Sequence, residues 1–105
     1  MELQELCFHL KNRRRMYVLD DRYSTVVAFL EGFNAAHDGE PLSGFQDWVS
    51  RRILGSSSPM HWSYVVASKR MPEILDANIG IDQIPASLEI LLIDDLAGLI
   101  EAFLG

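Results

Sequence analysis

Apolar residues recur every three or four positions along most of this chain, which is the spacing of an amphipathic α-helix. This periodicity predicts five helices, at about residues 2–12, 22–37, 44–54, 59–70 and 86–104. The chain has 105 residues, of which 49% are hydrophobic, and this is enough to build one core. We therefore expect an all-α fold, a single-domain bundle of about five helices that spans residues 1–105.

Capping residues set the expected ends of the second and third helices. Asp20 or Asp21 can cap the start of the second helix, and Gly39 ends it. Ser43 opens the third helix with Gln46 three residues later, which matches the capping-box pattern. Gly55 follows the third helix, where a C-terminal cap is expected.

The fourth segment has two interpretations. Ser58 followed by Pro59 suits the N-cap and first position of a helix over residues 59–70. Residues 62–67 are also rich in β-branched and aromatic side chains, which favour a strand. We prefer the helix and keep the strand as the alternative.

Residues 71–85 are the least regular part of the chain. Pro72 can start a single helical turn over residues 72–75, Gly80 interrupts it, and Pro85 precedes the last helix. The sequence leaves the structure of the rest of residues 71–85 open.

The last helix has an apolar arc that is wider than one packing contact requires. Asp95 falls inside this arc and would need a cation, for which an arginine from the first half of the chain is the expected source. Either the helix packs centrally, or its far edge meets another molecule. The predicted stripe contains Leu88, Leu91, Leu92, Leu96, Leu99 and Phe103, widened by Ile93 and Ile100.

The chemistry of known catalytic and metal sites is missing from the sequence. His9, His37 and His61 are far apart, Cys7 is the only cysteine, and no zinc, nucleotide-binding or hydrolase motif occurs. The positions of Cys7 and His37 in apolar stripes indicate a small buried side chain and a hydrogen-bonded structural histidine. We expect no enzyme activity, no cofactor and no metal. The N-terminal residues do not resemble a signal peptide, so we expect a cytoplasmic protein.

Acidic charge is concentrated in the last third of the chain. The net charge is −6; residues 1–70 hold 9 basic and 8 acidic side chains, whereas residues 71–105 hold 7 acidic and no basic ones. This balance disfavours nucleic acid and anionic membranes as partners and favours a basic protein. The candidate partner-binding residues are Asp76, Asp82, Asp94, Asp95 and Glu101.

A short basic run of Lys11 and residues 13–15 has two interpretations. The run can be the solvated end of the first helix, or it can contact an anion such as phosphate. Because Asp20 and Asp21 are close in sequence, we prefer the first interpretation.

The aromatic motifs of the chain resemble those of a group of small, largely uncharacterised bacterial proteins. Here they read Met16-Tyr17, residues 29–33 (Phe-Leu-Glu-Gly-Phe) and residues 45–48 (Phe-Gln-Asp-Trp), followed by Trp62 and an acidic, leucine-rich last helix. The group often carries Arg-Pro-x-Met-Tyr, Phe-Leu-x-Gly-Tyr and Phe-x-x-Trp at similar spacing. Our chain departs from it, with residues 14–15 both arginine in place of Pro-Gly.

Some proteins of this group resemble immunity proteins for bacterial toxins. The resemblance implies a non-catalytic bacterial protein-binding domain that neutralises a toxin, and the acidic last third suits a basic toxin. The alternative is a structural or regulatory helical domain that forms a homodimer through the surplus face of the last helix, burying Ile93 and Ile100.

Overall fold

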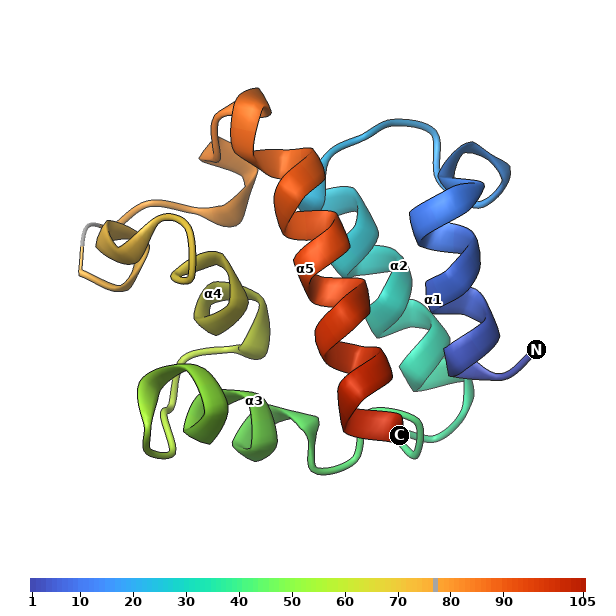
Figure 1. Ribbon diagram of the computed structural model, residues 1–105, viewed down its shortest axis with the longest axis horizontal. Coiled ribbons are helices and arrows are strands. Elements are labelled where there is room, and N and C mark those ends of the chain that lie inside the picture. Colours follow the sequence, from blue (N-terminus) through green and yellow to red (C-terminus); the bar gives the residue numbers. More distant parts are fainter. Residues whose placement is uncertain (77) are drawn as a thin grey trace.

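Five α-helices form the frame of the molecule (Figure 1). The computed structural model describes residues 1–76 and 78–105. In these residues there is no strand, and the radius of gyration is 13.0 Å, close to the value of about 13 Å for a single domain of this size. The predicted all-α, single-domain bundle is therefore confirmed. The helices are α1 (Leu3–Asn12), α2 (Tyr23–Ala36), α3 (Phe45–Leu54), α4 (Trp62–Ala67) and α5 (Ala86–Leu104), with short 3₁₀ helices η1 (Arg14–Met16), η2 (Pro72–Leu75) and η3 (Ile81–Gln83).

Helix α5 lies at the centre of the bundle. It contacts each of the other four α-helices, with α1 and α2 on one side and α3 and α4 on the other (Figure 1). Ile93, Leu96 and Ile100 are fully buried in this position. Central packing thus accounts for most of the wide apolar arc. The alternative hypothesis predicts a homodimer that buries Ile93 and Ile100. This prediction is wrong, because the chain's own core already covers both side chains.

The start of α2 is capped by a residue from α5. The backbone N–H of Tyr23 donates to Glu89 Oε1 at 3.2 Å, and Glu89 is buried. The guanidinium of Arg22 also lies 3.5 Å from this carboxylate and donates to the carbonyl of Asp82. Asp20 accepts only from the N–H of Arg22, which precedes the helix. The predicted cap by Asp20 or Asp21 is therefore wrong, because a carboxylate distant in sequence occupies the site.

Two polar contacts hold α4 against α2. The hydroxyl of Tyr23 donates to the carbonyl of Ser63 at 2.7 Å, and burial raises the pKa of this phenol far above its usual value. Glu31 accepts from the Trp62 indole N–H at 3.2 Å and lies 3.5 Å from His61 Nε2. One carboxylate of α2 therefore fixes the orientation of both side chains at the start of α4.

Aromatic rings pack between α3 and α4, and the side-chain amide of Gln46 forms a hydrogen bond next to them. The fully buried ring of Phe45 lies 5.6 Å from Trp62 and 5.4 Å from Phe103, measured between ring centroids. The Gln46 amide donates to the carbonyl of Met60 at 2.6 Å. The predicted capping box is wrong, since Gln46 makes this contact and Gly44, with φ 87°, occupies the N-cap without a side-chain hydrogen bond.

The fourth segment is a helix, but a shorter one than predicted. The strand alternative for residues 62–67 is wrong, because these residues form α4. The helix begins after His61, whose Nδ1 accepts from the N–H of Ser63 at 3.1 Å. Ser58 instead accepts from the N–H of Met60, so the predicted start at residue 59 is wrong. The predicted turn over 72–75 is confirmed as η2; within the segment 71–85, residue 77 lies outside the described residues.

Three predictions about single residues are confirmed, for Cys7, His37 and Gly55. Cys7 is fully buried, and this burial raises the pKa of its thiol to about 12, so the thiol stays protonated. The Nδ1 atom of His37 lies 2.8 Å from the carbonyl of Phe33, as expected for a structural histidine. Gly55 has φ 82° and forms the predicted C-terminal cap of α3. None of the described helices combines the length and apolarity that a membrane crossing needs.

We predict that Glu89→Ala lowers the free energy of unfolding by about 2–3 kcal/mol, because the buried N–H of Tyr23 then has no acceptor and α2 has no cap. Glu89→Gln keeps an acceptor oxygen and should cost only about 1 kcal/mol. Urea denaturation of the three proteins measures the difference. Equal losses for the two variants would show that the charge, and not the cap, is what stabilises this site.

Candidate partner-binding surface

The five acidic residues predicted to bind a partner do not form one surface. Asp76, Asp82 and Asp94 are exposed, and within the described residues no basic side chain forms an ion pair with any of them. Asp95 and Glu101 are partly covered and are held by cations of the same chain. Only the first three carry negative charge that is free for another molecule.

Asp95 forms the shortest ion pair of α5 in the described residues. Arg70 donates to it from Nε at 2.6 Å and from Nη2 at 3.2 Å, and Lys69 Nζ lies 3.7 Å away. This hydrogen-bonded carboxylate raises the pKa of the Arg70 guanidinium above its usual value. The prediction that Asp95 requires an arginine is confirmed. The prediction that this arginine comes from the first half of the chain is wrong, because Arg70 follows α4.

Glu101 is paired at the other end of the same helix. Its Oε1 atom lies 3.0 Å from Lys11 Nζ, which reaches over from α1. The two ion pairs therefore flank the outer side of α5, one toward α4 and one toward α1.

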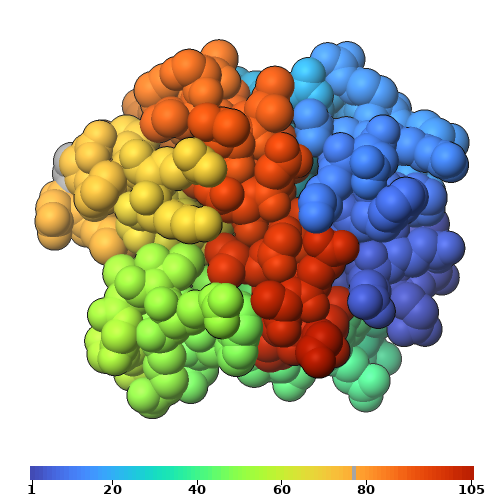
Figure 2. All heavy atoms as spheres, viewed as in Figure 1, coloured from blue at the N-terminus to red at the C-terminus, as the bar shows by residue number. Residues whose placement is uncertain are grey.

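A short strip on the exposed side of α5 precedes both ion pairs along the helix. Ile90 is 46% exposed and Leu91 is 42% exposed, with Asp94 one turn further along. Figure 2 shows the surface of α5 running uninterrupted down the middle of this face. Leu91 was predicted to be part of the buried stripe, and this is wrong, because the side chain points to the solvent side of the helix. We call Ile90, Leu91 and Asp94 the α5 strip.

Asp76 and Asp82 belong to a different part of the molecule. Asp76 lines a shallow depression together with Asn78 and Gly80. The carboxylate of Asp82 lies against Gly80 at the start of η3. Both residues precede α5, whereas Asp94 lies about two helical turns inside it.

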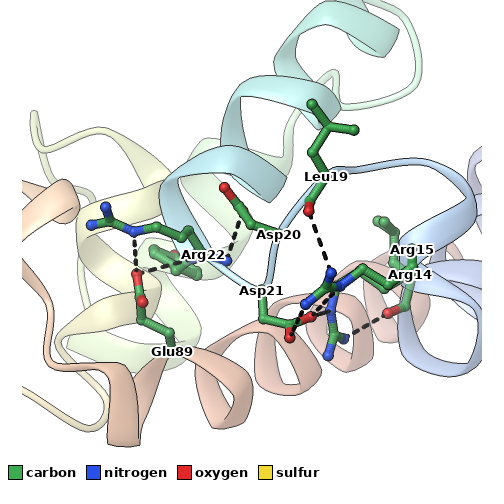
Figure 3. A network of polar contacts seen from close by, with 9 residues as sticks. Arg14, Arg15, Leu19, Asp20, Asp21, Arg22 and Glu89 are labelled. Atoms are coloured by element: carbon green, nitrogen blue, oxygen red, sulfur yellow. Dashed lines mark hydrogen bonds and ion pairs between the residues drawn. The ribbon is translucent and has the colours of Figure 1, made fainter.

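Contacts within the chain hold Arg14 and Arg15 of the basic run, so the two side chains do not form an open anion-binding site (Figure 3). Asp21 accepts from Arg14 Nε at 3.1 Å and from Arg15 Nη2 at 2.9 Å. Arg14 also donates to the carbonyl of Leu10, and Arg15 to that of Leu19. The two arginines lower the pKa of the Asp21 carboxyl below its usual value. Of the run, Arg13 forms no ion pair within the described residues.

Sequence reasoning missed a second acidic region, at the N-terminal end of α1. Glu2, Asp38 and Glu40 line an open groove of about 860 Å³, and none of them forms an ion pair within the described part of the chain. The charge count over residues 1–70 hid this region, because the bases of that segment pair with other carboxylates. The sequence feature that could have revealed it is the excess of acidic over basic side chains within residues 31–47.

The three histidines contact different residues. His61 contacts Glu31, while His9 stacks on Tyr17 with ring centroids 5.3 Å apart. Among residues 1–76 and 78–105 no three side chains of His, Cys, Asp or Glu lie together in a way that could hold a metal ion.

Comparisons with protein-family models, with curated proteins and with solved structures give no match to this chain.

We predict that Asp21→Asn destabilises the protein at neutral pH and that the difference from the wild type shrinks in acid. The pKa of Asp21 is lowered by folding, so its stabilising effect is complete above the unfolded pKa of about 4 and is lost as the pH falls through the lower folded value. Thermal unfolding between pH 7 and pH 2 measures it. A constant difference across this range would contradict the ion-pair explanation.

Proposed function

We propose that the protein is a non-catalytic protein-binding domain whose α5 strip takes a basic protein partner. The observation that carries this proposal is the strip itself: two exposed apolar side chains next to an unpaired carboxylate, on the one side of α5 that the bundle leaves open. The resemblance in the aromatic motifs suggests that the partner is a toxin and that the domain acts as its immunity protein. A cytoplasmic location is part of this proposal.

The surroundings of the strip support binding of a protein. Interfaces commonly place apolar side chains at the centre and polar groups at the rim. Here Ile90 and Leu91 provide the apolar centre, while the ion pairs of Asp95 and Glu101 provide a polar rim that is already satisfied. Asp94 adds a carboxylate that has no ion pair in the described residues, and this charge would pair with a lysine or arginine of the partner and speed association.

The net charge points to a basic partner. Five of the 15 acidic side chains pair with a lysine or arginine in the described residues, which leaves ten without such a partner; of the nine lysine and arginine side chains, only two have no carboxylate partner there. A basic protein approaching this surface is therefore attracted over most directions of approach.

A homodimer through the same strip is the second candidate. Exposed Ile90 and Leu91 favour it, since a second copy could cover them. Sedimentation distinguishes the two: a dimer that dissociates in a Leu91→Ser variant supports the homodimer, and a monomer that binds a different chain supports the first proposal.

We predict that the double variant Leu91→Ser/Asp94→Asn binds its partner at least about tenfold more weakly, because it removes the apolar centre and the free charge together. The partner to test first is the product of the reading frame directly upstream, by co-purification followed by calorimetric titration. Asp76→Asn/Asp82→Asn removes two exposed carboxylates outside the strip and serves as the control, with affinity expected to stay close to that of the wild type. The proposal fails if no complex forms, or if the control weakens binding as much as the strip variant.

A further inference from the structure

A groove with an acidic rim and an apolar floor lies at one end of α1. Phe33 of α2 and Leu104 of α5 form the apolar floor, whereas Leu3 of α1 is itself buried; Met1 and His37 also line the groove. The acidic rim consists of Glu2, Asp38 and Glu40. The groove is therefore shaped and charged to take a protruding apolar side chain that has a cation next to it.

A segment with these properties lies at the other end of α1. Residues 11–21 contain four basic and two acidic side chains. Leu19 is 93% exposed and Met16 is 70% exposed, while Arg13 is exposed and forms no ion pair in the described residues. We call residues 13–19 the basic loop.

The basic loop is held in a fixed shape before any partner arrives. Asp21 holds both Arg14 and Arg15, and Arg15 in turn donates to the carbonyl of Leu19. Figure 3 shows the Leu19 side chain directed away from this network, into the open. A side chain presented by a rigid loop loses little conformational entropy on binding, which favours association.

One chain cannot bring its own loop and groove together. They lie at opposite ends of α1, a helix of 10 residues and therefore about 15 Å in length. Figure 1 shows the turn after α1 at one end of the helix, and the N-terminus, the segment after α2 and the C-terminus together at the other. The complementary surfaces can meet only between two molecules.

We propose that the basic loop of one molecule docks into the groove of a second copy, with Leu19 on the apolar floor and Arg13 against the acidic rim. Charge complementarity supports this occupant, because the basic loop carries the exposed Leu19 and Arg13, and the groove carries an apolar floor and three carboxylates; neither Arg13 nor these carboxylates form an ion pair in the described residues. The contact joins different surfaces of the two copies, so one copy keeps a free groove and the other keeps a free loop. Such an interface produces open chains whose length rises with concentration. This association uses neither Ile90 nor Leu91 and does not depend on the function proposed above.

Sedimentation velocity from about 1 μM to about 1 mM tests this association, a range that covers weak contacts between small surfaces. We expect the wild type to form dimers and then longer species. The loop variant Arg13→Ser/Leu19→Ser and the groove variant Asp38→Asn/Glu40→Lys should each weaken association at least about tenfold. Asparagine tolerates the positive φ of Asp38, 59°. Arg52→Ser/Leu54→Ser makes the same two changes as the loop variant at the end of α3 and should associate like the wild type.

A mixture of the loop variant and the groove variant tests whether the loop of one molecule binds the groove of another. The loop variant keeps an intact groove, and the groove variant keeps an intact loop, so an equimolar mixture should form a one-to-one dimer that grows no further. Unchanged thermal unfolding midpoints show that each variant is folded. The proposal is overturned if the wild type stays monomeric throughout, if the mixture forms no dimer, or if Leu91→Ser abolishes the association. A basic protein that binds the groove while the wild type stays monomeric would assign the groove to another partner.

Discussion

The bundle depends on the buried carboxylate of Glu89, which joins the beginnings of α2 and α5. It accepts the N–H of Tyr23 and lies beside the guanidinium of Arg22, which in turn reaches the backbone of η3. A buried carboxylate without such partners would be very costly, so the arrangement is specific: it fixes how far α2 and α5 slide along each other. The ring of Tyr23 then extends from this point into the core and reaches α4, so that the position of a third helix follows from the same residue.

The buried residues of the aromatic stretch between residues 16 and 49 serve as the scaffold and not as a binding site. Phe45 lies at the meeting point of α3, α4 and α5, and Glu31 orients Trp62. Met16, at the head of the stretch, behaves differently, because it is exposed at the tip of a turn that two arginines and Asp21 hold in place. The surfaces that we propose for contact with other molecules are the two ends of α1 and the outer side of α5.

Periodicity was sufficient to predict the helices, because each buries one side against α5 and the spacing of apolar residues records this directly. It could not predict the caps. Asp20, Ser43 and Ser58 match local capping patterns, but Glu89, Gly44 and His61 occupy those sites, and their selection depends on contacts between residues distant in sequence. The candidate surface was predictable only in part for the same reason. A count of charges cannot reveal that Arg70 neutralises Asp95 while Glu2 and Glu40 form no ion pair in the described part of the chain, since ion pairing follows from packing.

The helix at the centre of this bundle, α5, follows in sequence the four helices that pack against it. During synthesis, α1 to α4 are made before Ile93, Leu96 and Ile100, the core residues of α5. Residues 1–85 hold their apolar faces without the helix that covers them, so the core cannot close until α5 has emerged from the ribosome. A nascent chain that stalls before residue 100 therefore exposes an incomplete core to chaperones and proteases.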